Sequence, residues 1–127
     1  MVDTCFLIDY QREVKARKAG PVMTFLRQYS TERLQISPVA WGEFLAGFPD
    51  EQDPFVLFAQ DRLDRLSLHS GVASQYRQVY RTLRASGSLI GANDLWIACH
   101  ALFLDQPLVT RNNSHFHRIP DIRLVEY

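Results

Sequence analysis

The stretch Ser88–Leu102, SLIGANDLWIACHAL, decides how the rest of the chain is interpreted. Its second half, Leu95–Leu102, is mostly apolar and indicates a buried helix. Asp94 stands at the mouth of that helix, after Gly91 and Asn93. An acid in that place has two explanations: it caps the helix, or it is one corner of a metal site. The other segments of the chain have to separate the two.

The composition is that of one soluble globular domain. The chain has 127 residues, of which 46% are hydrophobic and 22% charged, so it can bury a core without staples. No apolar run approaches the ~18 residues of a membrane helix, and no secretory signal is visible. Cys5 and Cys99 each lie in an apolar segment, so we expect both to be reduced and buried, in a cytoplasmic setting. No Cys/His spacing suggests zinc.

The net charge is zero, with fourteen basic and fourteen acidic residues. That balance argues against the broad basic patch of a double-stranded DNA binder. It does not exclude nucleic acid, because nearly all the positive charge is arginine, whose planar fork suits phosphate. For any single arginine, a solvated helix face is the simpler explanation. The arginines gather in two places: Arg77, Arg81 and Arg84, and then Arg111, Arg118 and Arg123.

Short strand candidates alternate with helix candidates along the whole chain. Strands are expected within residues 1–3, 33–37, 65–69, 107–110 and 122–127. Helices are expected from Thr4, after Gly20-Pro21, from Ser37-Pro38 to Gly47, from Asp53-Pro54, over residues 70–87, and from Asp94. This alternation predicts one α/β domain, residues 1–127, with a mostly parallel sheet and helices on both faces. In such sheets, sites form where strands end and helices begin.

Three carboxylates are expected at one edge of this sheet. Asp3 ends the first strand, Glu43 lies in the second turn of the helix after the second strand, and Asp94 opens its own helix. Glu43 has only small or apolar neighbours three and four residues away, so an ordinary solvated face does not explain it. Carboxylates gathered in this way repel one another and raise their pKa values. A shared Mg²⁺ or Mn²⁺ ion removes that conflict.

Each of these polar residues also has an ordinary structural explanation. Asp94 alone, and Asp3 before Thr4 alone, are more often helix caps than metal ligands. Asn112-Asn113 alone is a turn signal. The hypothesis of a metal site therefore rests on the convergence of separate segments, not on any one residue.

Four segments resemble the PIN-domain family in their order and spacing: DTCFLID, WGEFLAGF, IGANDLWIACHAL and LVTRNNSHFHRIPDIRLVEY. The closest likeness is to the VapC-like toxins of bacterial toxin–antitoxin pairs, and it spans essentially the whole chain. The resemblance implies a three-layer α/β/α sandwich around a mostly parallel sheet of four to five strands. It also implies a Mg²⁺- or Mn²⁺-dependent endoribonuclease whose acids meet in a negatively charged pocket.

Carried over by motif, the resemblance assigns catalytic roles to Asp3, Glu43, Asp94 and Asn112, and metal binding to the first three. Asn112 stands where many relatives have aspartate. Because an amide oxygen is a weaker and neutral ligand, Asn112 is expected to orient water or a neighbouring group. Cys5 stands where a serine or asparagine is usual, which removes a hydrogen-bonding side chain near Asp3.

Four further residues are expected on the substrate side of this site. Thr110 is the family's usual hydroxyl, Arg111 or Arg81 could clamp the RNA backbone, and His115 faces substrate while His117 is exposed. A cation held by the acids would activate water for phosphodiester hydrolysis.

The resemblance implies two protein partners and leaves two other functions open. The partners are a cognate VapB-like antitoxin, whose tail fills the acidic groove and often inserts an arginine, and a second copy of the chain in a homodimer. One alternative is a PIN-like RNA-processing nuclease that is not a toxin. The other is a non-catalytic Mg²⁺-binding module. A receiver domain is one module of this kind, and it would need a lysine after its last strand. The only lysines, Lys15 and Lys18, lie near the start of the chain, which argues against a receiver domain.

Overall fold

The strands are short and pair in parallel. In a computed structural model that describes residues 1–127, β1 (Leu34–Ile36) pairs with β2 (Leu63–Arg65), and β3 (Leu108–Val109) pairs with β4 (Leu124–Val125). Val2 forms single parallel bridges to β1 and to β3, which joins the two pairs. The order is therefore β2, β1, Val2, β3, β4. The α/β prediction is confirmed, and the predicted sheet of four to five strands is present only as these short pairs and bridges.

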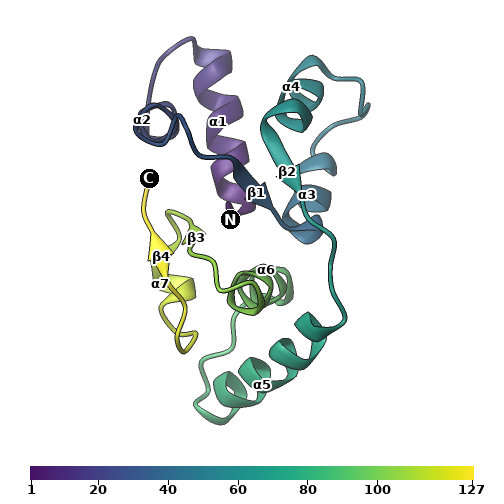
Figure 1. The fold of residues 1–127 in the computed structure, drawn as a ribbon, viewed down its shortest axis with the longest axis vertical. Coiled ribbons are helices and arrows are strands. Elements are labelled where there is room, and N and C mark those ends of the chain that lie inside the picture. Colours follow the sequence, from purple (N-terminus) through teal and green to yellow (C-terminus); the bar gives the residue numbers. More distant parts are fainter.

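Seven helices connect and cover these strands. In Figure 1, α5 lies alongside α6, and α1 lies beside α2, which agrees with the packing of these pairs. None of the helices has the length and apolar composition needed to span a membrane. The helices are α1 (Thr4–Ala16), α2 (Pro21–Gln28), α3 (Pro38–Leu45), α4 (Pro54–Arg62), α5 (Gly71–Ala85), α6 (Ala92–Phe103) and α7 (Asn113–Phe116).

Capping side chains mark the start of three of the seven helices, α1, α3 and α4. Ser37 and Asp53 accept hydrogen bonds from backbone N–H groups in the first turns of α3 and α4, as the sequence predicts. The start of α2 is held differently, by Glu13 of α1. Its carboxylate accepts from the backbone N–H groups of Gly20, Val22 and Met23 at 2.9–3.0 Å, which are groups without a partner inside the helix. A Cβ at residue 20 would meet the Glu13 carboxylate at 2.5 Å, so a larger residue there would displace the Glu13 side chain.

The structure differs from the sequence prediction at three places. The strand expected over residues 65–69 forms two residues earlier, because pairing Leu63 with Leu34 places the Leu63 side chain in the core. The turn signal at Asn112-Asn113 opens the short helix α7, which buries Phe116 completely. Cys99 is buried as expected, and Cys5 is partly exposed; both thiols are free.

The buried helix predicted from the opening stretch is α6. Its side chains from Leu95 to Ala101 are buried with the single exception of Trp96, which is partly exposed. Trp96 stacks on Tyr76 of α5, with ring centroids 4.4 Å apart. Because α6 is fixed on nearly all sides, the residues of its first turn are held in place by the core.

Candidate active site

Asp3 is buried where the Val2 bridge ends and α1 begins, with 3% of its surface exposed. Its Oδ1 accepts from the backbone N–H of Phe6 at 2.9 Å, which makes it the N-cap of α1. Its Oδ2 accepts from the Thr110 hydroxyl at 2.5 Å. Burial raises the pKa of Asp3, the two hydrogen bonds oppose that rise, and the charges of Asp94 and Asp9 add to it. Asp3 is therefore confirmed as the cap of α1, which uses its Oδ1. Its Oδ2 instead connects α1 to Thr110 after β3.

Thr110 orients this carboxylate from the end of β3. It is fully buried, donates to Asp3, and its oxygen accepts from the backbone N–H of Asn112 at 2.9 Å. One hydroxyl thus joins the acid at the start of α1 to the loop after β3. The sequence predicts Thr110 on the substrate side of the site, and the structure instead buries it, with its hydroxyl between Asp3 and Asn112.

Thr110→Val should lower the free energy of unfolding by about 1–3 kcal/mol, because a nearly isosteric methyl leaves a buried carboxylate oxygen and a backbone N–H without partners. The pKa of Asp3 should also rise further, since the lost hydrogen bond is one that lowers it. Urea unfolding measures the change. Thr82→Val on α5 is the matched control, because the Thr82 hydroxyl is exposed and donates only to a carbonyl of its own helix. Equal unfolding midpoints for the two variants would contradict the role of Thr110.

Glu43 of α3 links the starts of α1 and α6. Its Oε2 accepts from the Thr4 hydroxyl at 2.5 Å, and its Oε1 accepts from the Asn93 side-chain amide at 2.7 Å. Thr4 follows Asp3 and Asn93 precedes Asp94, so Glu43 ties together the two segments that carry the other acids. Thr4 and Asn93 were not among the predicted site residues. Their adjacency to the two aspartates was the only sequence signal for them.

Asp94 lies in the first turn of α6 and is not its cap. The N-cap is Gly91, which makes no side-chain capping bond. The Asp94 carboxylate instead lies 3.3 Å from Nδ1 of His115 in α7. The cap explanation for Asp94 is therefore wrong. A carboxylate at the N-terminal end of a helix is nevertheless favoured by the helix dipole.

The donor atoms suit a divalent cation, although no three carboxylate, imidazole or thiol groups gather closely enough to form a complete metal site. Asp3 and Asp94 offer hard carboxylate oxygens, and they lie within electrostatic reach, because the charge of Asp94 raises the pKa of Asp3. Both oxygens of Glu43 accept hydrogen bonds, as both oxygens of Asp3 do, but the Glu43 donors are side chains from the two segments that carry Asp3 and Asp94. Asp3 and Asp94 have the ligand atoms that a divalent cation prefers. Glu43 connects the two segments that carry them, through Thr4 and Asn93. A direct bond from Glu43 to metal stays a prediction.

The other predicted residues are placed in different ways. Arg111 forms an ion pair with Asp9, with Nη1 and Oδ2 2.8 Å apart. Asn112 precedes α7, and its side-chain amide makes no hydrogen bond. Arg81 is exposed on α5, and no hydrogen bond or ion pair links it to the acids. His117 is exposed, as the sequence predicts.

Asp9 is the charged residue that the sequence-based prediction missed. It is 8% exposed, forms an ion pair with Arg111, and accepts hydrogen bonds from the Tyr127 hydroxyl at 3.1 Å and from Arg12 at 3.3 Å. Its position within the apolar part of the first helix was a usable signal, because charged side chains are rarely buried unless they are paired.

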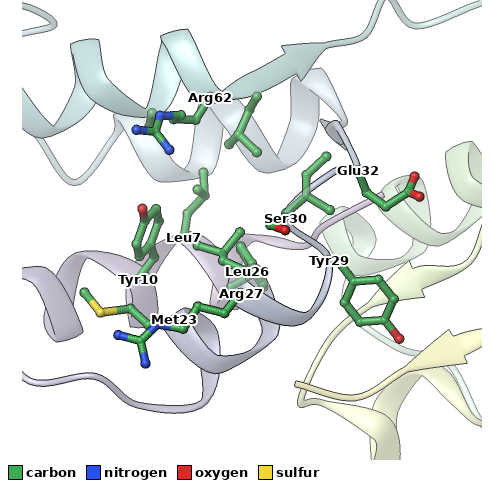
Figure 2. Close-up of a pocket in the computed structure, with 13 residues that line it drawn as sticks. Leu7, Tyr10, Met23, Leu26, Arg27, Tyr29, Ser30, Glu32 and Arg62 are labelled. Atoms are coloured by element: carbon green, nitrogen blue, oxygen red, sulfur yellow. The ribbon is translucent and has the colours of Figure 1, made fainter.

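A pocket of about 430 Å³ is formed by residues of α1, α2, α4 and the two strands β1 and β2. Figure 2 shows its lining, in which the side chains of Leu7, Met23 and Leu26 are labelled. None of the predicted site residues lines this pocket. The carboxylates therefore do not lie in this apolar cavity.

Comparisons with known proteins show which family the chain resembles over most of its length. The PIN domain model matches residues 1–122. Ribonuclease VapC1 of Methanocaldococcus jannaschii is 28% identical over 100% of this chain and 85% of its own length. Ribonuclease VapC1 of Haemophilus influenzae strain R2866 is 33% identical over 72% of each chain.

Solved structures share the fold of this chain. VapBC-1 from nontypeable Haemophilus influenzae is 28% identical, with a TM-score of 0.80 over 99% of this chain and 96% of that one. VapBC2 from Rickettsia felis, bound to a DNA fragment from its promoter, has a TM-score of 0.85 over 100% of this chain and 97% of that one. Its identity is 22%, so this second likeness concerns the fold alone.

Proposed function

This chain belongs to the PIN-domain family, and we propose that it is a Mg²⁺- or Mn²⁺-dependent endoribonuclease, the toxin of a VapBC-type pair. The observation that carries the proposal is the pair of carboxylates at the starts of α1 and α6. Asp3 is oriented by Thr110, and the segments of Asp3 and Asp94 are tied together by Glu43. The relatives named ribonuclease VapC1 support RNA as the substrate class.

Asp3 and Asp94 would hold the cation, which when bound activates water and offsets the charge that develops on the phosphate. The chain's own residues prepare this site. Thr110 and the first turn of α1 each fix one oxygen of Asp3. Glu43 fixes the start of α6 through Asn93. These bonds hold the carboxylates before substrate arrives, so less reorganisation is needed during the reaction.

Groups near the carboxylates would face the RNA. His115 is half-exposed beside Asp94, and Arg111 is half-exposed one residue after Thr110. The free amide of Asn112 would orient water or a phosphate oxygen. Arg81, the alternative clamp, has no contact that supports this role. The acids alone repel phosphate, so these neighbours and the cation would each add to the attraction for the backbone.

The partners and the finer fold belong to the same proposal. The solved relative from nontypeable Haemophilus influenzae is VapBC-1, which supports a VapB-like antitoxin as partner. A homodimer and a cytoplasmic location are proposed with it. The linking of both strand pairs through Val2 supports a three-layer sandwich around a central parallel sheet.

Induced expression in bacteria tests the toxin role. Wild-type chain should arrest growth, co-expression of the small gene next to its own should relieve the arrest, and Asp94→Asn should not arrest growth. Mapping RNA 5′ ends shortly after induction should reveal new internal cuts. Normal growth together with cuts confined to precursor RNA would favour the alternative, a PIN-like processing nuclease that is not a toxin.

Added Mn²⁺ should stabilise the protein against unfolding, by about 2.7 kcal/mol at a hundredfold excess over the dissociation constant. The reason is that the cation binds only where folding brings Asp3 and Asp94 together. Thermal unfolding with and without Mn²⁺ measures the shift, and Asp94→Asn should remove most of it. Glu51→Gln is the control, because Glu51 is exposed, outside every helix and strand. An equal shift in both variants would place the cation elsewhere.

A further inference from the structure

We propose that Arg12 and Arg111 form a subsite for an RNA backbone phosphate, organised by the buried carboxylate of Asp9 and lying next to the catalytic carboxylates. This proposal rests on the proposed function, because its ligand is part of the same RNA substrate. Asp9, Arg12 and Tyr127 had no predicted role, and Arg111 was expected only as a possible clamp on the backbone.

Asp9 is the centre of this arrangement. Its Oδ2 forms an ion pair with Nη1 of Arg111 at 2.8 Å and accepts a hydrogen bond from the Tyr127 hydroxyl at 3.1 Å. Its Oδ1 accepts from Nη1 of Arg12 at 3.3 Å. The Tyr127 ring packs edge-on against Phe6, with centroids 5.0 Å apart. The Asp9 carboxylate, which is 8% exposed, therefore positions the guanidinium groups of Arg12 and Arg111.

Both guanidinium groups keep most of their donors free. The side chains of Arg12 and Arg111 are 69% and 52% exposed, and apart from Asp9 no hydrogen bond or ion pair engages either one. They line a depression of about 180 Å³. Glu13 lines it as well, but its carboxylate is occupied by the three backbone N–H groups at the start of α2. The groups left to meet a ligand are mainly guanidinium donors, which match phosphate oxygens in pairs.

The depression adjoins the catalytic carboxylates. Arg111 follows Thr110, whose hydroxyl is bonded to Asp3. The charge of Asp9 helps to raise the pKa of Asp3. The pKa of the partly exposed Cys5 thiol is affected by charges from both groups, namely Asp3 and Asp94 of the site and Asp9 and Arg111 of the depression. A strand of RNA with one phosphate at Asp3 and Asp94 would therefore bring a neighbouring phosphate toward the two arginines.

Binding of a short fluorescein-labelled single-stranded oligoribonucleotide to the full chain, measured by anisotropy in EDTA, tests the subsite without cleavage. Arg12→Gln and Arg111→Gln should each weaken binding about tenfold and reduce the slope of log affinity against log salt by about 0.7. Arg33→Gln is the matched control, because Arg33 is 68% exposed and also paired with an aspartate, Asp64, at 2.6 Å. It should change affinity by less than about twofold.

Asp9→Asn separates positioning from simple charge. Removing a negative charge would strengthen RNA binding if the arginines acted only through their field. If Asp9 positions them, Asp9→Asn should weaken binding instead, and Tyr127→Phe should weaken it to a smaller degree. Tighter binding by Asp9→Asn, or Arg12→Gln and Arg111→Gln variants that bind like Arg33→Gln, would overturn the subsite. Should Asp9→Asn fail to fold, the two arginine variants decide alone.

Cleavage by the wild-type chain with Mg²⁺ is measured separately on the same RNA. Cleavage with unchanged binding in the arginine variants would overturn the subsite and leave the nuclease proposal standing. Weakened binding in those variants, with no cleavage by wild type, would support the subsite and overturn the nuclease proposal.

Discussion

Asp94→Asn should abolish RNA cleavage, with a fall in rate of at least about a hundredfold, while the protein stays folded. The carboxylate is one of the two that would hold the cation, whose electrostatic contribution to such reactions is several kcal/mol, and each 1.36 kcal/mol is a factor of ten in rate. The folding contribution of Asp94 is small by comparison. It does not cap α6, and its contact is a half-exposed imidazole at 3.3 Å, a kind of pair that contributes about 0–1 kcal/mol.

Single-turnover cleavage of labelled RNA measures this effect, with urea unfolding as the check on folding. Asp121→Asn changes an exposed acid near the end of the chain and should cleave at the wild-type rate. An Asp94→Asn variant that cleaves as fast as wild type would remove Asp94 from the reaction. Loss of cleavage together with an unfolded circular dichroism spectrum would contradict the assignment of a purely functional role.

Asp3→Asn should also abolish cleavage, yet it should make the metal-free protein more stable at neutral pH. The amide oxygen can still accept from the Phe6 N–H, so the cap of α1 is kept. The other oxygen becomes an NH2 group, which can donate to the Thr110 hydroxyl oxygen in place of the bond that Thr110 donates to Asp3. The main change is then the loss of the buried charge. Burial raises the pKa of Asp3 above its ordinary value, with the charges of Asp94 and Asp9 adding to the rise. The ionised carboxylate is therefore a cost to the folded state, and the neutral amide removes that cost.

The pH dependence follows from the direction of this shift. The folded state holds the proton of Asp3 more tightly than the unfolded chain does. Protonated Asp3 therefore adds to the free energy of unfolding of the wild type below the unfolded pKa of about 3.9. This contribution is lost as the pH rises through the raised pKa of the folded state. The advantage of Asp3→Asn over wild type should therefore grow with pH and then level off. Urea unfolding at a series of pH values, without metal, measures it. An Asp3→Asn variant that is less stable than wild type at neutral pH contradicts this account.

These opposite effects on stability and activity fit a site that is prepared for a cation. In the metal-free protein the Asp3 charge is unfavourable, because it is buried near two other carboxylates. Bound Mn²⁺ would reverse the balance, so the order of stability of wild type and Asp3→Asn should invert when the ion is added. Proteins commonly keep such locally destabilising groups where function requires them.

Features that depend only on neighbouring residues, such as helix caps and buried helix faces, were predictable from the sequence. The caps at Ser37 and Asp53 and the buried run of α6 follow from residue type and spacing, and all three are present. The position of β2 was not predictable in the same way, because its register depends on which residues of β1 it meets. Leu63 and Leu66 are equally plausible as strand residues until the pairing with Leu34 selects the first.

The candidate site was predictable in part. Asp3 and Asp94 could be selected because one follows a strand and the other opens a helix, and Glu43 could be selected because its neighbours on the helix are small or apolar. Their partners could not be selected, because Thr4, Asn93 and Asp9 act through contacts between segments up to 118 residues apart, as in the bond from Tyr127 to Asp9. Sequence spacing carries no information on such contacts. It also suggested a cap at Asp94, which the structure assigns to Gly91.

The central claim is that the purified chain cuts RNA internally and needs a divalent cation. A circular single-stranded RNA, which has no ends for an exonuclease, tests both parts at once. The account predicts linear products with Mg²⁺ or Mn²⁺, none in excess EDTA, and recovery of cutting when Mn²⁺ is restored. Undiminished cutting in excess EDTA, or intact circles with either ion, would contradict it.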